Sequence, residues 1–371
     1  MSKNTRELPF TEIVERVSEN MRIRSDQEKK VRGIINDVYV RDIPRKEDWS
    51  FLVVSSTVTT VEEYTTGNAT INTGGTTITF SSTFVASSSF IGRQIKISGN
   101  DYVYELDGQS GSTGMTIQPP FSGNQNVSGA PFSIFEAKYS LAGDFDRFPK
   151  NGGLYKFQGG AYEVIPEYSY QDFRTEYSPS TTNTPTRCIL LGADTAGNRI
   201  VEISPPAKIA VSLPYDYYKV LRPMRETTGF LTSIGTSQTA VTGSSGFSLF
   251  TEAVTGWYLR VDAFGTGADS EWYPIAAITT RSNLTLAVSF GLSAAGTTMF
   301  TLCPAPDMPV RMHPAVMYGA MTQIAADQND PLVQGYMLKY AEVLSDGKIL
   351  YKTRTYSQQV SLMAEDYLYR R

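Results

Sequence analysis

The chain has 371 residues, which is enough for two or three domains of about 150 residues each. Its 33 Lys and Arg against 37 Asp and Glu give a net charge of −4, which argues against a nucleic-acid coat held by bulk positive charge. One histidine and two cysteines exclude both a four-ligand Cys/His zinc site and a disulfide framework. We therefore expect reduced thiols in a soluble cytosolic protein, since the polar N-terminus is no export signal and no apolar run reaches the ~18 residues of a membrane span.

Residues 1–51 have the pattern of two helices joined by a short connection. Ile13, Val17 and Met21 recur on one helical face. Ser25 and Glu28 have the spacing of a capping box at the start of the second helix. The apolar stripe of that second helix is Val31, Ile34, Ile35 and Val38. This pattern predicts an antiparallel helical hairpin.

The composition changes four times along the rest of the chain. Residues 52–135 are rich in Thr, Ser and Gly and alternate like short strands, and the same pattern returns in residues 229–303. Residues 136–228 are mixed, with turn signals at Asn151-Gly152-Gly153 and Gly159-Gly160. Residues 304–346 are helical again, and 347–371 are polar, rich in Tyr and weakly patterned.

Two apolar stripes predict a second helical hairpin near the C-terminus, and each helix begins at or just after a proline. The first stripe follows Pro314 and consists of Val316, Met317, Ala320, Met321 and Ile324. The second follows Pro331 and consists of Val333, Tyr336, Met337, Tyr340, Val343 and Leu344.

The two β-rich segments resemble each other. Tyr104 and Phe121 are 17 residues apart, and so are Tyr273 and Phe290, with an apolar–Thr–apolar strand between each pair. Each segment is predicted to be a small sandwich or barrel, serving either as surface decoration or as a docking site for a neighbouring protein.

The expected fold is therefore α+β and multidomain. A helical-bundle scaffold with N- and C-terminal hairpins and a mixed β centre would comprise residues 1–51, 136–228 and 304–346. Two inserted, mutually similar all-β modules would be residues 52–135 and 229–303, and residues 347–371 would form an extended tail.

Candidate chemistry is sparse. Asp144-Phe145-Asp146 could be half of a carboxylate metal site but is more typical of a solvated loop, and Glu62-Glu63 with Glu365-Asp366 could supply acid/base carboxylates only if they met in space. Cys188 is expected in a core and His313 at a helix start. We predict no catalytic residue, no metal and no cofactor, so the chain is not expected to be an enzyme.

The C-terminal tail indicates a binding role. Ordering its 25 residues costs on the order of tens of kcal/mol in backbone entropy, which so few apolar residues cannot recover alone. We expect other chains to hold it. Its aromatic and apolar anchors would be Tyr351, Tyr356, Leu362, Met363, Tyr367, Leu368 and Tyr369, and its rim charges Lys352, Arg354, Arg370 and Arg371.

Three stretches in order resemble the adaptor (head–tail connector) proteins of tailed bacteriophages. The first is Ile34-Ile35-Asn36-Asp37-Val38-Tyr39. The second runs from Leu141-Ala142-Gly143-Asp144-Phe145 through Thr186-Arg187-Cys188-Ile189-Leu190-Leu191 to Ile203-Ser204-Pro205-Pro206 and Pro214-Tyr215. The third is Met312-His313-Pro314-Ala315-Val316-Met317-Tyr318-Gly319-Ala320.

The resemblance implies a structural protein of the virion neck, made in the host cytoplasm. It implies a homo-oligomeric ring, usually twelve-fold, that docks under the portal protein, receives a tail nozzle or tube protein and lets DNA pass during ejection without sequence-specific binding. The tail, with the residues named above, would bind the portal. The two β modules depart from the shortest members of that family, and docking of tail fibres is the role we expect for them.

A second hypothesis is a tail-associated receptor-binding protein that binds or depolymerises carbohydrate. The β modules would then be lectin-like, with Trp257 and Trp272 as sugar platforms. That reading leaves both helical hairpins and the C-terminal tail without a purpose.

Overall fold

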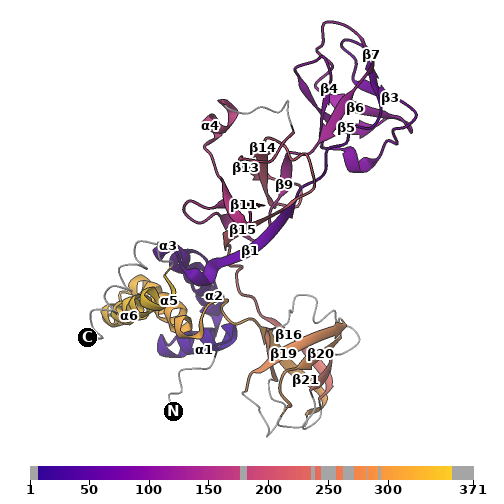
Figure 1. Cartoon of the computed structure of the whole chain (residues 1–371). Helices are drawn as coiled ribbons and strands as arrows, with labels where there is room; N and C mark the ends of the chain where they lie inside the picture. The colour runs from indigo at the N-terminus through magenta and orange to yellow at the C-terminus, as the bar shows by residue number, and fades with distance from the viewer. Residues whose placement is uncertain are drawn as a thin grey trace. The chain divides into compact units, whose positions relative to one another are not determined.

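The structure is a computed structural model that describes residues 7–175, 182–234, 239–243, 256–261, 271–280, 282–290 and 294–352 (Figure 1). Within these residues the fold is mixed α+β, mostly sheet, with a few helices that include a C-terminal one. The chain divides into two compact units. One joins the residues up to Leu52 with those from Leu221 onward, and the other is Val53–Val220.

The first unit contains a group of mutually contacting helices. They are α1 (Phe10–Asn20), α2 (Glu28–Asp37), α3 (Ile43–Lys46), α5 (His313–Asp327) and α6 (Val333–Tyr351), with a π-helical turn at Val38–Asp42. Helix α5 packs on α6, α2 and α1, and α1 packs on α2 (Figure 1). The predicted stripe of Ile13, Val17 and Met21 is buried, as 3.6-residue periodicity requires of a core-facing helix.

The predicted capping box at Ser25 and Glu28 is wrong. Ser25–Gln27 forms a single 3₁₀ turn, and α2 begins at Glu28 with no side-chain cap hydrogen bond. The backbone carbonyls of Arg24 and Ser25 accept the N–H groups of Gln27 and Glu28. The turn thus supplies the acceptors that a capping side chain would otherwise provide.

The second unit has a central part made of two antiparallel sheets. One sheet has the order β1 (Val53–Thr59), β15 (Ser212–Lys219), β11 (Gly153–Gln158), β12 (Ala161–Pro166), and β10 (Phe145–Arg147) also pairs with β15. The other has the order β13 (Arg187–Ala193), β14 (Arg199–Ser204), β9 (Lys138–Ser140). The short helix α4 (Tyr170–Thr175) comes before β13 in the chain. Cys188 lies, as predicted, in the buried cluster of this part, together with Leu154 and Tyr215.

Strand β1 lies outside the first β module, so the predicted module boundary at residue 52 is too early. All seven residues of β1 pair with β15, from Val53 opposite Tyr218 to Thr59 opposite Ser212. The strand alternates like those that follow it, but its partner is about 160 residues away, and local patterns cannot reveal such a pairing.

The remaining strands form two larger β structures, one in each unit. In the second unit a seven-stranded sheet has the order β7 (Val127–Ala130), β2 (Ala69–Ile71), β3 (Thr77–Phe80), β6 (Gly114–Gln118), β5 (Val103–Gln109), β4 (Gln94–Ile97), β8 (Phe132–Phe135). In the first unit a closed barrel has the order β16 (Thr227–Ile234), β17 (Ala240–Gly243), β20 (Asn283–Leu286), β19 (Tyr273–Thr280), β18 (Tyr258–Val261), β21 (Ala294–Cys303), and β21 pairs back onto β16.

The two β structures have corresponding strand orders and pairings. In the sheet, Ile95 lies opposite Tyr104 and Ile134, and in the barrel Leu259 lies opposite Tyr273 and Leu302. Both also have a register shift at the same place in the next pair of strands. The shift follows Leu106 opposite Ile117 in the sheet and Ile275 opposite Leu286 in the barrel.

An aromatic pair recurs as well. The rings of Tyr104 and Phe121 are 5.5 Å apart between centroids, and those of Tyr273 and Phe290 are 5.0 Å apart. All four side chains are buried. The 17-residue spacing seen in the sequence therefore corresponds to a core contact in both structures.

Candidate functional site

The base of the predicted tail is tied to the segment that follows α3. Helix α6 continues to Tyr351, so residues 347–351 are helical. The prediction of an extended tail from residue 347 is therefore wrong for these residues. The carboxylate of Glu47 is 2.6 Å from Nζ of Lys348 and 2.9 Å from Nζ of Lys352. The hydrogen bonds to these two ammonium groups lower the pKa of Glu47.

Aromatic packing strengthens the same junction. Trp49 is fully buried, and its indole N–H donates to the carbonyl of Ile43 at 2.7 Å. Phe51 stacks on Trp49 with ring centroids 5.6 Å apart and meets the ring of Tyr351 edge-on at 6.2 Å. Trp49 also forms an isolated antiparallel bridge with Lys352. We call Glu47, Trp49, Phe51, Tyr351 and Lys352 the tail anchor.

A glycine lets α6 reach the tail anchor. Gly347 is buried, and a Cβ at this position would collide with Sδ of Met312 and contact the ring of Trp49. The helix can therefore pass close to these side chains only because residue 347 has none.

Two of the predicted portal-binding residues are thus placed. Tyr351 packs against Phe51, and Lys352, a predicted rim charge, is paired with Glu47. The others lie outside the described residues: Arg354, Tyr356, Leu362, Met363, Tyr367, Leu368, Tyr369, Arg370 and Arg371. Glu47, Trp49 and Phe51 were not identified from the sequence, because their partners lie about 300 residues away.

The outer face of α6 exposes two large apolar side chains. Leu338 is 70% exposed and Ile349 is 65% exposed, and the helical period places both on the side opposite the buried Leu344 and Gly347. Met337, predicted in the core stripe, is 57% exposed, although it lies seven residues before Leu344 on the same side of the helix. Large apolar side chains exposed on the outer face of a helix are typical of a surface that another element covers.

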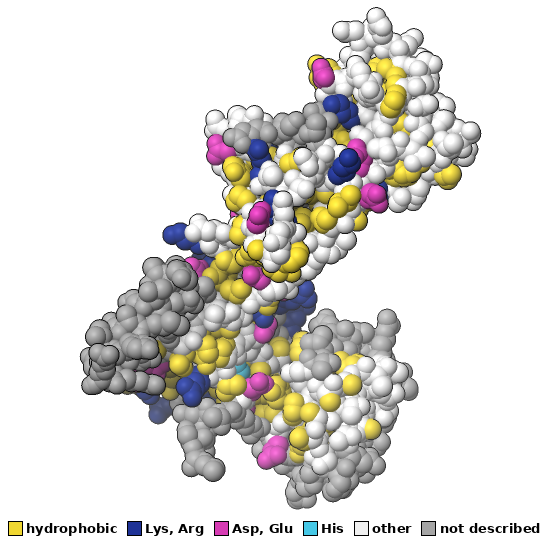
Figure 2. All heavy atoms as spheres, in the orientation of Figure 1, with side chains coloured by type: hydrophobic (Ala, Val, Ile, Leu, Met, Phe, Trp, Pro, Cys, Tyr) yellow, Lys and Arg dark blue, Asp and Glu magenta, His cyan; other side chains and the backbone are white. Residues whose placement is uncertain are grey.

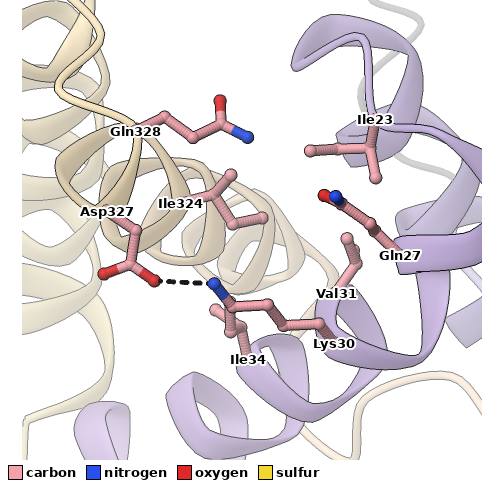
Figure 3. A pocket seen from close by; sticks show the side chains of 8 residues that line it. All are labelled: Ile23, Gln27, Lys30, Val31, Ile34, Ile324, Asp327 and Gln328. Carbon is pink, nitrogen blue, oxygen red and sulfur yellow. Dashed lines mark hydrogen bonds and ion pairs between the residues drawn. The ribbon is translucent and has the colours of Figure 1, made fainter.

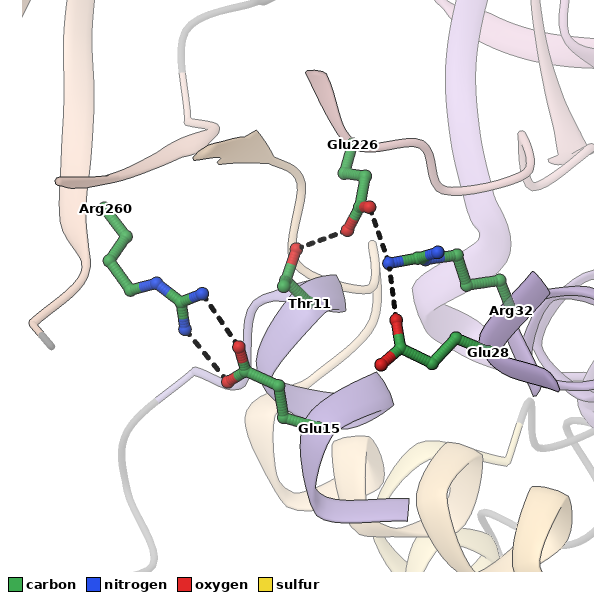
Figure 4. Close-up of polar contacts among 6 residues, drawn as sticks. All are labelled: Thr11, Glu15, Glu28, Arg32, Glu226 and Arg260. Carbon is green, nitrogen blue, oxygen red and sulfur yellow. Dashed lines mark hydrogen bonds and ion pairs between the residues drawn. The ribbon is translucent and has the colours of Figure 1, made fainter. Parts of the chain in front are cut away.

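Polar contacts in the first unit join the helices to the barrel (Figure 4). Glu226 accepts a hydrogen bond from the hydroxyl of Thr11 at 3.0 Å and pairs with Arg32 at 2.7 Å. Arg260 of β18 contacts both carboxylate oxygens of Glu15 on α1, at 2.7 and 2.9 Å. The barrel is thus linked to α1 by a two-pronged ion pair.

Trp272 does not offer the sugar platform of the receptor-binding hypothesis. Trp272 is only 7% exposed, and the guanidinium of Arg260 lies 4.7 Å from its ring centroid. Trp257 packs against the barrel core. A sugar platform needs an open ring face, and the ring of Trp272 is covered.

The only histidine has a structural environment. His313 begins α5, as predicted, and is 1% exposed. Its Nδ1 accepts the N–H of Leu8 at 3.0 Å, so its Nε2 carries the proton and donates to the carbonyl of Met308 at 3.1 Å. Burial lowers the pKa of His313, which keeps the ring neutral.

Asp144, Asp146 and the two thiols have structural surroundings, and Glu365-Asp366 lies outside the described residues. Asp144 accepts a hydrogen bond from the Tyr217 hydroxyl at 2.7 Å, and Asp146 pairs with Arg147 at 2.8 Å. Burial raises the pKa of Cys188 to about 12 and that of Cys303 to about 11, so neither thiol is activated. Among the described residues there is no group of three His, Cys, Asp or Glu side chains that could hold a metal ion.

Two surface cavities stand out. One, in the first unit between α2 and the end of α5, measures only about 20 Å³, room for one or two waters, and Lys30 and Asp327 form an ion pair of 3.1 Å beside it (Figure 3). Its lining is Ile23, Gln27, Lys30, Val31, Ile34, Ile324, Asp327 and Gln328. The other, in the second unit, measures about 520 Å³ and opens beside β12.

The exposed surface carries charges of both signs. On the face shown in Figure 2, basic and acidic side chains are scattered among uncharged ones. In the described part of the chain, no helix combines the length and apolarity needed to cross a membrane.

Comparisons with known proteins identify no family. No protein-family model matches the chain, and no curated protein does either. Among solved structures, the translation elongation factor SelB of Methanococcus maripaludis matches in its apo form and in complex with the GTP analogue GppNHp. Each match covers 71% of this chain and 64% of that one, less than two thirds of its length, at 9% identity and a TM-score of 0.16. Similarity this low carries no argument about fold or function.

Proposed function

We propose that the chain is a structural head–tail connector of a tailed phage. An oligomeric ring of it would join the portal to the tail nozzle or tube and let DNA pass. The observation that carries the proposal is that α6 exposes the apolar side chains of Leu338 and Ile349 on its outer face and has the tail anchor at its end. Exposed apolar side chains on a helix, with a predicted binding segment after its end, suit a ring subunit that also binds a second ring.

The proposal includes a finer description of the fold. We interpret the contacting helices α1, α2, α5 and α6 as a bundle scaffold, and the two β structures as insertions derived from one module. The shared strand order, the common register shift and the recurring aromatic pair support this interpretation. Outward docking of fibres remains the role we propose for the modules.

The charge of the chain supports passage of DNA without retention. A net charge of −4 makes bulk phosphate neutralisation unfavourable, and charges of both signs are interspersed on the visible face. DNA could then slide through the ring without specific contacts.

The test mixes the purified chain with the portal protein of the same genome and images the product by negative-stain electron microscopy. The full chain should add a ring beneath the portal. A chain that ends at Lys352 should not, although it keeps every contact of the tail anchor. Absence of a ring with the folded full-length chain would contradict the connector function.

A further inference from the structure

The β11–β12 hairpin presents an apolar face to solvent. Cross-strand partners share a face, so Tyr155, Phe157, Tyr162 and Val164 lie together on one side of it. We call these four residues the hairpin face. Phe157 and Tyr162 are each 65% exposed, with ring centroids 5.2 Å apart, and Val164 is 42% exposed. An aromatic patch of this kind on a sheet face is typical of an interaction surface.

The same hairpin has an outer strand edge, since β12 ends the order of its sheet. Strand β13 contacts the end of β12, where Glu167 forms an isolated parallel bridge with Cys188, so the open part of the edge lies at Tyr162 and Val164. Its two-residue turn, Gly159 and Gly160, has φ of 63° and 86°, as a type I′ turn requires. In such a hairpin the pair next to the turn is hydrogen-bonded, and the pairs then alternate. Tyr162 and Val164 therefore direct their N–H and C=O groups away from β11, where the described residues provide no partner.

The charge of Glu163 on this edge favours one kind of binding partner. Glu163 lies between Tyr162 and Val164, is turned to the opposite face, and pairs with Lys156 at 3.2 Å. A second copy of β12, paired through both outward residues, would place Glu163 directly opposite itself. Like charges in that position destabilise strand pairing. The edge therefore disfavours self-association and favours a cation opposite Glu163.

A cavity extends the edge at its far end. The 520 Å³ cavity is lined by Val164, Pro166, Glu167 and the loop from Phe148 to Gly152. Pro166 has no N–H to offer, and Glu167 already bridges to Cys188, so pairing of a bound segment would stop before Pro166. The cavity could take the next side chain of that segment.

We infer that β12 binds an extended segment of another protein by strand addition, and that this segment carries a basic residue between two apolar ones. Main-chain hydrogen bonds to Tyr162 and Val164 would supply affinity, and the hairpin face and Glu163 would supply selectivity. The inference is independent of the connector function, because it concerns only the second unit.

The test measures fluorescence anisotropy of two labelled nine-residue peptides with the full-length chain. Both contain alternating Thr and Val, with either Lys or Glu at the centre between two Val. The Lys peptide should bind about tenfold more tightly than the Glu peptide at low salt. Glu163→Lys should reverse that preference, whereas a merely adhesive apolar patch would show none.

A second variant tests the main-chain hydrogen bonds. Val164→Pro removes an N–H that the hairpin itself does not use, so the fold should persist while binding of the Lys peptide falls about tenfold or more. Val164→Thr keeps the N–H and should retain binding. No binding of either peptide, equal binding of both, or unchanged binding by Val164→Pro overturns the inference. Dimerisation of the wild-type chain that Val164→Pro abolishes would assign the edge to a second copy and overturn it as well.

Discussion

The buried ring of His313 should make the free energy of unfolding depend on pH. Its folded pKa lies below the ordinary value of about 6.5, so the unfolded chain takes up a proton before the folded chain does. The free energy of unfolding should therefore fall as the pH drops below about 6.5, by at most about 1.4 kcal/mol per pH unit from this group.

Urea unfolding at pH 7.5 and 5.5 measures this effect in the wild type and in His313→Gln. The variant lacks the titrating group, so the stability difference between the two proteins should shrink as the pH falls. A difference that stays constant over this range would show that His313 does not titrate in this way.

Two glycines on α6 differ in the space around them, so a substitution at one is a control for the same substitution at the other. Gly347→Ala places a Cβ against Met312 and Trp49, and we expect a loss of about 1–3 kcal/mol from overpacking. Gly335→Ala meets no atom within 4 Å and should stabilise the helix by about 0.5–1 kcal/mol. Chemical denaturation of both variants checks the signs, and destabilisation by Gly335→Ala would contradict this account of the helix.

At the scale of elements, the outer face of α6 is the surface on which the ring proposal depends. Replacing Leu338 and Ile349 by Ser removes two exposed apolar side chains without touching the packed side. The double variant should stay folded but remain monomeric in sedimentation velocity under conditions where the wild type forms rings. Val85→Ser, at a 74% exposed position of the second unit, is the control and should not affect assembly.

The sequence predicts elements with local signals better than those that depend on distant partners. The helices at both ends follow from 3.6-residue periodicity, and the turn at Gly159-Gly160 follows from its residues. Met337 is exposed although it shares a side of α6 with the buried Leu344, because periodicity identifies a helix face but not how far a partner covers it. The contact of Lys352 with Glu47 was not predicted, because nothing near Lys352 in the sequence indicates it.

The hairpin face could have been found without a structure. Tyr155 and Phe157 alternate before the turn, and Tyr162 and Val164 alternate after it. That symmetry places all four on one side of a hairpin. Which side the core covers depends on residues outside the hairpin, such as Cys188 and Ile203, which share a buried cluster with Leu154.

At the scale of the whole molecule, the two β structures have similar buried residues but different exposed residues. Met115 and Leu284 are buried at corresponding positions, but exposed Glu105 corresponds to Pro274 and exposed Asp107 to Ala276. A common core with different surfaces indicates that the two do not bind the same partner in the same way.

The first and last residues of the barrel segment lie side by side, since Thr227 is opposite Leu302. Replacing residues 227–302 by a short Gly-Ser linker should leave the helices folded and ring formation intact, because paired residues of this kind are ~5 Å apart. Far-UV circular dichroism and negative-stain imaging check both outcomes. Loss of the helical signal would show that the barrel is part of the scaffold rather than an insertion.

The buried imidazole also makes the protein convenient to observe. With one histidine in 371 residues, the ring protons of His313 give a single pair of aromatic resonances with the chemical shifts of a fixed tautomer. Because Nδ1 holds the N–H of Leu8, any event that pulls the N-terminal segment away would change those shifts. The protein thus carries a built-in spectroscopic reporter, and assembly could be followed in solution without an attached label.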